Sequence, residues 1–438
     1  MSPRELNPTE AADLLRTTDS IGLPLGPGQP PTLIHALGAR TDWASLEVLC
    51  AMLVDFYELP NRSGVRTLST FFGPAERVYR DAGADIHYIP ADYRRFARVY
   101  EDRRPRVMAT MAAPPDANGY ASLSLHAGAT VEELHRAGAD PDRVLMVEVS
   151  EAFPTTLGLS DDHPHRLHLD EIDVLIRSDR VPVVFEVGPM SEAETAIAGL
   201  ARRFIHDGST IQTGFGTIPS AIATALAAAD GGDYGIHSEM FTTGLMRLCQ
   251  SGKVTNAAKS IFEGRSITSF AAGIPELYSW IDGRTDIAFA PVSVVNDPMV
   301  IAGNHHMVTI NGAIAVDLYG QVVADTVGPQ QYSGVGGHED FVSASGLDLS
   351  DRSLICMPST VTLHDGTVTS RIVASLPTGS PVSTPRHQTD VVITEHGVAE
   401  LRGRTVAERA VAMASVAHPD FRDRLLVASE GWPETAAR

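Results

Sequence analysis

Ile21-Gly-Leu-Pro-Leu25, followed directly by Gly26-Pro-Gly-Gln-Pro-Pro31, is the stretch from which the fold is predicted. A short apolar run, typical of a strand, ends in a turn rich in glycine and proline, and helical spacing then continues from Thr32 to Leu37. Proline suits the beginning of a helix, and the order strand, tight turn, helix is the building unit of α/β proteins. The stretch therefore predicts a βα unit.

The same unit returns in the second half of the chain. Arg202–Thr213 predicts a helix end and a strand, Gly214–Pro219 the turn, and Ser220–Ala229 an Ala-rich helix. Further pairs match in the same order along the chain: Gly64, Ser69, Gly73 and Glu76 with Gly264, Ser269, Gly273 and Glu276, and Asp116 and Gly119 with Asp317 and Gly320. Ordered matches at nearly constant spacing indicate an internal repeat.

The repeat predicts an α/β fold of two similar lobes, each with a mixed or parallel sheet flanked by helices. We expect a first lobe over residues 1–188 and a second over residues 189–438, joined at the loop Gly188–Glu192. Short apolar runs of this length are typical of buried strands. They predict strands at Val144–Val149, Val181–Val187, Ser353–Met357 and Val391–Thr394, and helical spacing predicts a C-terminal helix from Val406 to about Val416.

Composition limits the classes of function. The formal charge of -20 and the lack of a basic stripe argue against a nucleic-acid partner, although helix N-termini can still bind small anions. Three widely spaced cysteines predict a reduced protein with neither a disulfide framework nor a zinc motif. The polar start of the chain and the absence of a long apolar run predict a cytoplasmic protein with no membrane association.

The segment Gly235-Ile-His-Ser-Glu-Met-Phe241 contains one carboxylate, Glu239. The pattern predicts a strand end, a turn and a helix that begins near Glu239 and stops at Gly252, so that Glu239 favours the helix dipole. The offset between matched residues of the two halves is 188 at Gly214 and 200 at Gly264. The second half therefore gains about twelve residues around Glu239, either for a local function or as a neutral loop insertion.

Two glycine-rich turns could bind anionic groups. Gly214–Pro219 is a candidate phosphate cradle, because glycine permits close approach to the backbone and the next helix offers unpaired amides; tight turns also use glycine for steric reasons alone. Ser333-Gly-Val-Gly-Gly-His-Glu-Asp-Phe341 could aim successive amides at an oxyanion, or could form a hairpin between strands.

Other chemistries find less support in the sequence. His163, His165 and His168 follow two aspartates, but the spacing suits a solvated loop as well as a metal site, and we expect no metal. No Gly-x-Ser-x-Gly elbow is present, which argues against an α/β-hydrolase serine mechanism. No dinucleotide-binding glycine motif opens a helix, which argues against a nicotinamide enzyme.

Six motifs give the chain a resemblance to a known family: Asp207–Pro219, Ile236–Met240, Val295–Pro298, Asp317–Gln321, Tyr332–Gly337 with Asp340 and Phe341, and Thr394–Gly403. They resemble the acetyl-CoA hydrolase/transferase family, the class I CoA-transferases that include 4-hydroxybutyrate CoA-transferase. The resemblance covers nearly the whole chain. It implies two α/β lobes with the active site between them, usually in a homo-oligomer, here expected to be a homodimer. Coenzyme A and acyl-CoA are then substrates, with no tightly bound cofactor.

The resemblance also implies roles for individual residues. Glu239 falls on the family's catalytic glutamate, which becomes a glutamyl-CoA thioester, and this places the catalytic residue in the second lobe. Positions implied to bind CoA are Gly214, Phe215, Gly216, Thr217, Ile218, Ile314, Ser333, Gly336 and Gly337. Two positions depart from the family pattern: His338 replaces a common glutamine, and Thr362 stands where many relatives have a lysine linked to CoA binding.

The expected activity is transfer of CoA from a small acyl-CoA to a carboxylate acceptor, with ping-pong kinetics. Hydrolysis of an acyl-CoA such as acetyl-CoA by the same glutamate is the alternative. A non-catalytic CoA-binding homologue is a third interpretation, which the presence of Glu239 and both glycine turns argues against. The acyl group and the acceptor are left open, because one apolar substitution changes preference by only about 1–3 kcal/mol.

Overall fold

The computed structural model describes residues 2–126, 128–345 and 348–430, and it divides the chain into two compact units. Unit 1 comprises residues 1–186, 239–243 and 265–297, and unit 2 comprises residues 187–238, 244–264 and 298–438. The units differ from the predicted lobes in two segments, since residues 239–243 and 265–297 belong with the first unit. The division of the repeat at residue 188 stays a prediction. The last eight residues of the predicted second lobe, 431–438, lie outside the described part.

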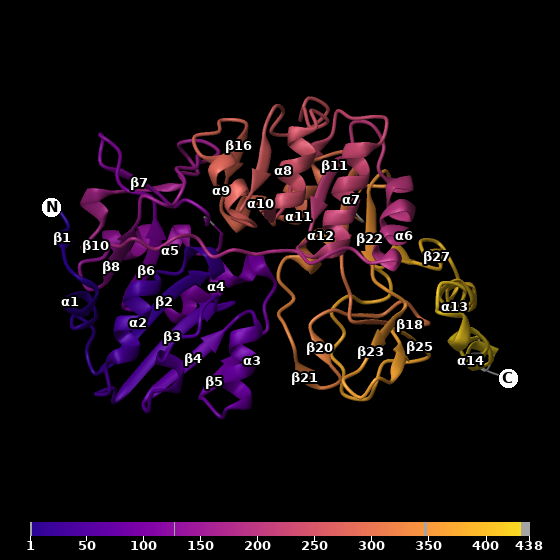
Figure 1. Cartoon of the computed structure of the whole chain (residues 1–438), viewed down its shortest axis with the longest axis horizontal. Helices are drawn as coiled ribbons and strands as arrows, with labels where there is room; N and C mark the ends of the chain where they lie inside the picture. The colour runs from indigo at the N-terminus through magenta and orange to yellow at the C-terminus, as the bar shows by residue number, and fades with distance from the viewer. Residues whose placement is uncertain (1, 127, 346–347, 431–438) are drawn as a thin grey trace. The chain divides into compact units, whose positions relative to one another are not determined.

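Unit 1 is built on an eight-stranded sheet in which all neighbouring strands run parallel (Figure 1). In sheet order the strands are β1 (Arg4–Glu5), β10 (Val174–Arg177), β8 (Val144–Val149), β6 (Val107–Ala112), β2 (Thr18–Leu25), β3 (Ser45–Ala51), β4 (Val65–Ser69) and β5 (Ile86–Tyr88). The helices that accompany it are α1 (Pro8–Ala12), α2 (Pro31–Ala39), α3 (Pro74–Asp81), α4 (Tyr93–Arg103) and α5 (Val131–Ala139).

Both faces of this sheet are covered, because side chains alternate between them along each strand. In β3, Val48 and Cys50 pack with Leu33 of α2 in one buried cluster, whereas Leu49 and Ala51 pack in another. The second cluster contains residues of α4 and α5. Continuous apolar runs were the signal for these strands, and burial on both faces is the physical reason for such runs.

Three small ladders complete unit 1. Strands β7 (Tyr120–Ser122) and β9 (Arg166–His168) pair antiparallel, whereas β13 (Met240–Thr242) with β15 (Phe270–Ala272), and β14 (Ser266–Thr268) with β16 (Ile287–Phe289), pair parallel. Two helices follow in the same part of the chain, α9 (Pro275–Ile281) and α10 (Val292–Val295). The β13–β15 ladder joins the two inserted segments of unit 1.

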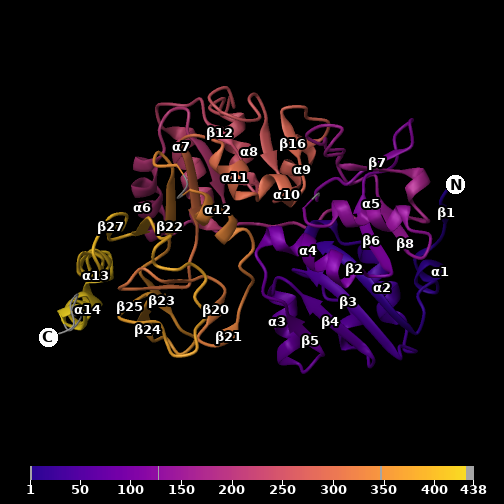
Figure 2. The same ribbon diagram turned by 180° about the vertical axis from the view of Figure 1, so that it is seen from behind.

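Unit 2 contains a six-stranded sheet that is parallel except at one edge, where β26 and β27 are antiparallel (Figure 2). In sheet order its strands are β12 (Gly235–Ile236), β11 (Thr210–Thr213), β17 (Met307–Asn311), β22 (Arg352–Cys356), β26 (Val391–Thr394) and β27 (Gly397–Glu400). Leu354 and Cys356 pack with α6 (Glu192–Ala201) and α7 (Thr217–Ala228), while Ile355 packs on the opposite face with α13 (Val406–Ser415).

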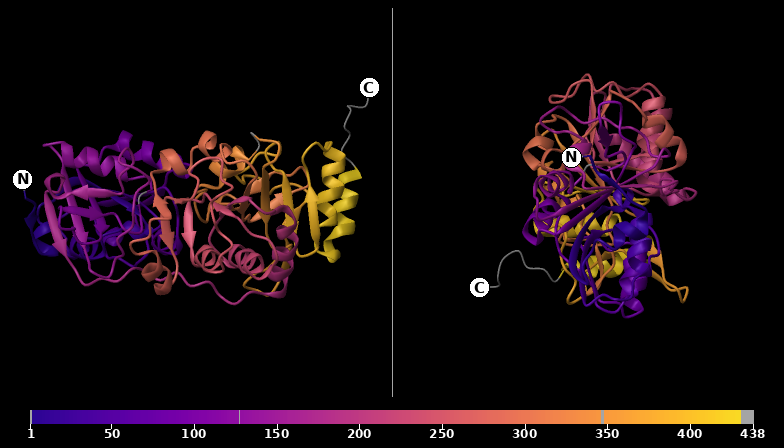
Figure 3. Two further views of the ribbon diagram at one scale, coloured as in Figure 1. Left: turned by 90° about the horizontal axis from the view of Figure 1, so that it is seen from above. Right: turned by 90° about the vertical axis from the view of Figure 1, so that its left-hand side faces the viewer.

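The remaining elements of unit 2 extend from this sheet. They are α8 (Thr243–Gln250), α11 (Pro298–Ala302), α12 (His338–Ala344), α14 (Pro419–Glu430), and the short strands β18 (Ala315–Asp317), β19 (Val322–Val323), β20 (Thr326–Val327), β21 (Gln330–Gln331), β23 (Thr360–Thr362), β24 (Val368–Ser370) and β25 (Ile372–Val373). Of the yellow C-terminal helices, α13 packs beside β27 and α14 packs against α13 (Figure 3). Within the described ranges, no helix combines the length and apolar character needed to cross a membrane.

The strand order of the two sheets agrees with the predicted internal repeat. In unit 1 the order β3-β2-β6-β8-β10 places the first βα unit, β2 to α2, next to β3 and β6. In unit 2 the order β12-β11-β17-β22-β26 places the second βα unit, β11 to α7, in the corresponding position. The matched glycines Gly64 and Gly264 precede β4 and β14, which pair with β5 and β16 in the same parallel sense.

Several predicted elements are confirmed, among them the strands Val144–Val149 and Val391–Thr394 and the helix from Val406. The predicted strand Val181–Val187 is wrong, because the segment pairs with no strand. Pro182 has no amide hydrogen for a ladder, and Val181 and Val184 are 69% and 44% exposed, so this apolar run is not a buried one.

Candidate functional site

Glu239 lies in a short bend between β12 and β13 and not at the start of a helix. The prediction of a helix beginning at Glu239 is therefore wrong: α8 begins at Thr243, and its first turn contains no acidic residue. The reason is that Met240–Thr242 pair with β15 before the helix can begin. The predicted stop is confirmed, since Gly252 adopts a φ of +76° just after α8.

The backbone of Glu239 is bound at its carbonyl oxygen by four donors. The amides of Ser269 and Phe270 donate over 3.0 and 3.2 Å, and the hydroxyls of Thr268 and Ser269 donate over 3.0 and 2.9 Å. These donors come from the end of β14 and the start of β15, in the same unit as Glu239. Such a clamp fixes the backbone from which the carboxylate projects.

Asn296 orients the side chain of Glu239. The amide nitrogen Nδ2 of Asn296 donates to Oε2 of Glu239 over 2.7 Å. Asn296 is completely buried at the C-terminal end of α10, whereas Glu239 is only partly buried. Hydrogen bonds from a neutral donor to a carboxylate favour its ionised form and fix its direction without adding a positive charge.

A buried tyrosine lies near Glu239, and a buried histidine contacts that tyrosine. Burial, and secondly the carboxylate of Glu239, raises the pKa of Tyr93 well above its ordinary value, so the phenol stays neutral. The Tyr93 hydroxyl is 3.3 Å from Nε2 of His126, and burial lowers the pKa of His126 to about 3. Both rings are therefore uncharged at neutral pH.

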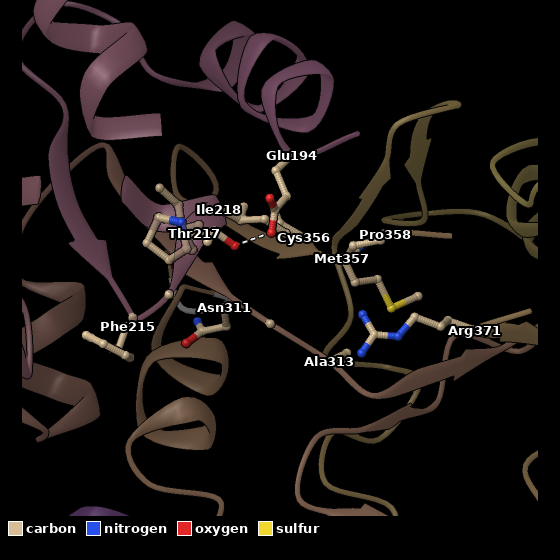
Figure 4. Close-up of a pocket in the computed structure, with 15 residues that line it drawn as sticks. Glu194, Phe215, Thr217, Ile218, Asn311, Ala313, Cys356, Met357, Pro358 and Arg371 are labelled. Atoms are coloured by element: carbon tan, nitrogen blue, oxygen red, sulfur yellow. Dashed lines mark hydrogen bonds between the residues drawn. The ribbon is translucent and has the colours of Figure 1, made fainter. Parts of the chain in front are cut away.

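A separate cavity in unit 2, with a volume of about 290 Å³, contains the second group of predicted residues (Figure 4). Its walls include the turn Gly214, Phe215 and Gly216 and the first two residues of α7, Thr217 and Ile218, so the helix begins three residues earlier than the predicted Ser220. The ends of β17 and β22 supply further walls through Asn311 and Met357, and Arg371 completes the lining. The carboxyl ends of parallel strands are where α/β proteins place ligands.

The start of α7 shows why the turn needs glycine. Gly216 has φ +130° and ψ -176°, a conformation that essentially only glycine adopts, and it caps α7 without a side-chain hydrogen bond. Thr217 donates from its hydroxyl to Glu194 of α6, as drawn in Figure 4. Because Gly216 provides no side-chain cap, the first amides of α7 have no side-chain acceptor at this cap, which suits the predicted cradle for an anion.

The other four predicted CoA-binding residues lie outside this cavity's lining. Ile314 follows β17, and its amide already donates to Val323 over 2.7 Å. Ser333, Gly336 and Gly337 lie between β21 and α12, and the Ser333 amide donates to Asp325 over 2.9 Å. Gly337 caps α12, so this stretch leads into a helix and the alternative of a glycine hairpin between strands is wrong.

The histidines that were considered for a metal site have other roles. His165 is buried, and its Nε2 lies 2.9 Å from both the Ser124 carbonyl and the Thr156 hydroxyl. Nδ1 of His168 accepts from the Asp170 amide. Among the described residues, no three His, Cys, Asp or Glu side chains are grouped so as to hold a metal ion.

Comparison with known proteins identifies the family. Residues 273–429 match the acetyl-CoA hydrolase/transferase C-terminal domain. The chain is 32% identical over 428 residues to succinyl-CoA:cyclohexane-1-carboxylate CoA transferase of Geobacter metallireducens, covering 97% of this chain and 94% of that one. It is 32% identical over 405 residues to 4-hydroxybutyrate coenzyme A transferase of Clostridium kluyveri, covering 91% of each.

The chain belongs to the acetyl-CoA hydrolase/transferase family. A solved structure agrees: RipA from Yersinia pestis is 30% identical, with a TM-score of 0.89 over 98% of this chain and 97% of the other. The resemblance found in the sequence is therefore confirmed, and so is its α/β fold. This member of the family is an enzyme that acts on CoA thioesters.

One departure from the family pattern, His338, has a structural partner in this member of the family. Nε2 of His338 lies 2.8 Å from Oγ1 of Thr384, and burial lowers the pKa of His338 to about 4. The Thr384 hydroxyl donates to Glu339, so its oxygen accepts from the neutral His338 ring. Thr362, the other departure, is exposed at the end of β23.

Sequence reasoning missed the residues that surround Glu239. Asn296, Ser269 and Tyr93 were not assigned roles, although the motif Val295-Asn-Asp-Pro298 was one of the stretches that indicated the acetyl-CoA hydrolase/transferase family. The asparagine within that motif was the available signal. Its partner could not be read from the sequence, because 57 residues separate Asn296 from Glu239.

Proposed function

We propose that this enzyme transfers CoA from a small acyl-CoA to a carboxylate acceptor, with Glu239 as the nucleophile. The observation that carries the proposal is the 2.7 Å hydrogen bond from Asn296, which orients the Glu239 carboxylate while its own carbonyl is clamped. A carboxylate becomes an effective nucleophile when it is positioned against an activated carbonyl and partly desolvated. The hydrogen bond from Asn296 to Oε2 of Glu239 supports the required positioning of the carboxylate.

The first half-reaction forms a covalent intermediate. One carboxylate oxygen of Glu239 attacks the thioester carbon of the acyl-CoA, the carbon–sulfur bond breaks, and CoA thiolate leaves a mixed anhydride behind. The thiolate then attacks the carbonyl carbon of Glu239, and the acyl group departs as a free carboxylate. The enzyme now holds glutamyl-CoA, so the energy of the thioester is conserved.

The second half-reaction reverses these steps with another carboxylate. The acceptor attacks the glutamyl-CoA carbon and releases CoA thiolate, which attacks the acceptor's carbonyl carbon in the new anhydride. A new acyl-CoA leaves, and Glu239 returns as a free carboxylate. The first product departs before the acceptor binds, and the expected kinetics are therefore ping-pong.

The remaining assignments are proposals about binding and assembly. Gly214–Ile218 would bind part of CoA through the backbone of the turn before α7, and Ile314, Ser333, Gly336 and Gly337 would contribute elsewhere. The acyl donors and acceptors would be small, as in the names of the CoA-transferases that resemble the chain. We also propose a cytoplasmic homodimer, which light scattering of the purified protein and cell fractionation would test.

Hydrolysis is the second candidate, because the family description names hydrolases together with transferases. Water would then replace the acceptor carboxylate and resolve glutamyl-CoA. The two activities differ in one measurement: a turnover rate that rises with added acetate, succinate or 4-hydroxybutyrate indicates transfer. A rate that ignores all carboxylates indicates hydrolysis.

Mass spectrometry of the intact protein tests the nucleophile. After incubation with a panel of acyl-CoAs, the wild type should gain the mass of CoA, and peptide mapping should place the adduct on Glu239. Glu239→Gln, which has the same size but no nucleophilic oxygen anion, should give no adduct and lose turnover by at least about 10³-fold. Full turnover in Glu239→Gln would refute the assignment, and CoA binding without any adduct would revive the non-catalytic alternative.

A further inference from the structure

Arg371 has a guanidinium group without a partner in the part of the chain that the structure describes. It lines the 290 Å³ cavity of unit 2, and its Nε is buried without a hydrogen bond. In Figure 4 the guanidinium end points into the cavity beside Met357 and Ala313. Its backbone is fixed on both sides, since its amide donates to Ser359 and its carbonyl accepts from Val316.

The usual reasons for burying an arginine are missing here. Glu395 lies near enough to act on Arg371 electrostatically, but its carboxylate oxygens accept from the amide and hydroxyl of Ser359 over 2.8 and 2.5 Å. Burial consequently lowers the pKa of Arg371, with Tyr332 and Glu395 offsetting this in part. Arg371 is partly buried, and a buried guanidinium nitrogen without a hydrogen-bonded partner costs stability, so its presence at a cavity points to a ligand.

The opposite part of the same cavity also suits an anion. The turn Gly214–Ile218 opens α7, a helix of 12 residues whose cap Gly216 provides no side-chain acceptor for the first amides. Phosphate groups bind at such glycine turns, and the planar guanidinium fork matches two phosphate oxygens. One cavity therefore combines a backbone cradle with an unpaired cation.

We propose that Arg371 binds a phosphate group of CoA in this cavity. The proposal rests on the proposed function. Arg371 would supply the positive charge that this chain lacks at Thr362. Many relatives have a lysine near Thr362, but in this chain Thr362 is exposed and uncharged. A carboxylate of the acyl donor or acceptor could also pair with a guanidinium, and the experiments below separate the two anions.

Direct binding measurements give the first test. Calorimetry compares CoA with pantetheine, which lacks every phosphate, on the wild type, Arg371→Met and Arg371→Lys. Because the loss of a charge-assisted hydrogen bond weakens binding, Arg371→Met should bind CoA roughly 10- to 100-fold more weakly than the wild type. The CoA affinity of Arg371→Lys should lie between those of the wild type and Arg371→Met. Pantetheine should bind all three proteins equally. Arg404→Met removes the same charge from an exposed position and should leave CoA affinity within about twofold of the wild type.

Two results would overturn the proposal. One is an Arg371→Met variant that binds CoA as tightly as the wild type. The other is an Arg371→Met variant whose defect is a raised KM for the acceptor carboxylate, with CoA binding unchanged, which would assign the cation to a carboxylate. Failure of the proposed function looks different: the wild type then binds CoA but forms no adduct at Glu239, and the comparison of CoA with pantetheine remains decisive.

Thermal unfolding distinguishes a binding role from a structural one. Since Arg371 makes no side-chain bond that the structure describes, ligand-free Arg371→Met should unfold at the same temperature as the wild type or higher. Inorganic pyrophosphate should raise the unfolding temperature of the wild type and not that of Arg371→Met. A lower unfolding temperature for ligand-free Arg371→Met, together with an undiminished response to pyrophosphate, would contradict the proposal.

Discussion

Nδ2 of Asn296 donates a 2.7 Å hydrogen bond to Oε2 of Glu239, and this bond joins a fully buried amide to a partly exposed carboxylate. The amide fixes the position of one oxygen of this carboxylate. Because the donor is a neutral amide, it orients the carboxylate without adding a positive charge beside it. Removal of the Asn296 amide should therefore lower the activity more than the stability of the fold.

Asn296→Ala should lower kcat/KM by roughly 10- to 100-fold, since a hydrogen bond to a charged group contributes about 1.5–3 kcal/mol. Asn296→Asp should be less active still at pH 7, because two adjacent carboxylates raise the pKa of one of them. The acidic limb of the pH profile should accordingly move to higher pH in Asn296→Asp alone. Steady-state kinetics between pH 5 and 9 would check this, and an Asn296→Ala enzyme with wild-type turnover would contradict it.

The turn before α7 offers a matched pair of glycine variants. Gly216→Ala should destabilise the protein by about 1–3 kcal/mol, because φ of +130° strains any residue with a side chain. Gly214 has no positive φ, and an added methyl would have only the Ile310 carbonyl, at 3.9 Å, within 4 Å. Gly214→Ala should keep the wild-type stability and still weaken CoA binding, because its methyl enters the cavity wall.

Urea unfolding and CoA titration of the two variants test this pair. Gly216→Ala should lower both the free energy of unfolding and the affinity for CoA. Gly214→Ala should lower the affinity for CoA alone. If Gly214→Ala binds CoA with unchanged affinity, the turn does not approach the ligand closely.

Lys259 provides a prediction about pH and stability. It is one of two lysines in the chain, it donates from Nζ to the Ile236 carbonyl over 2.9 Å, and burial lowers its pKa from 10.5 to about 7. Between pH 7 and 10 the unfolded chain keeps the lysine proton that the folded protein has released. The free energy of unfolding therefore rises with pH through this window, by at most about 1.4 kcal/mol per pH unit from this group.

Lys259→Met should lack that contribution. The stability of the wild type relative to Lys259→Met should increase from pH 7.5 to 9.5, as measured by urea unfolding at each pH. Lys253→Met, at the other lysine, should follow the wild type in parallel. Selective ¹³C labelling of lysine should give two ε-carbon signals, one of which titrates near pH 7; two signals that both titrate above pH 10 would contradict the prediction.

His338 should be replaceable by the glutamine that relatives commonly have. A glutamine amide can donate to Thr384 as the neutral ring does, so His338→Gln should keep stability at pH 7.5 within about 1 kcal/mol. The pKa of His338 is lowered to about 4, so the unfolded chain binds this proton first as the pH falls below about 6.5. The wild type then loses stability that His338→Gln keeps, up to about 2 kcal/mol at pH 5.

His338→Leu is the control, because it fills the space but leaves the Thr384 oxygen without this donor. In unfolding experiments at pH 7.5, His338→Leu should be less stable than the wild type and His338→Gln. At pH 5, the wild type should have lost stability relative to His338→Gln. An equal loss of stability in the wild type and in His338→Gln between these two pH values would show that His338 does not carry the effect.

Local patterns in the sequence were sufficient for much of the sheet. Val144–Val149 and Val391–Thr394 are runs of mostly apolar, β-branched residues, and both form strands with the predicted bounds. Val181–Val187 carries a similar run and forms no strand: Val181 and Val184 are exposed, and Pro182 cannot donate to a ladder. Apolar content alone therefore predicts a strand only where neighbouring strands are available to bury it.

By itself, the sequence determined the family, the repeated βα unit and the position of Glu239 in the chain, since each is written in a contiguous motif. Tertiary structure alone decided that Glu239 lies in a bend before a strand, that Asn296 donates to its carboxylate, and that Arg371 lines the same cavity as Gly214–Ile218. The physical reason is distance along the chain. Hydrogen bonds and desolvation depend on which residues meet in space, and these residues are brought together only when the parallel sheets form.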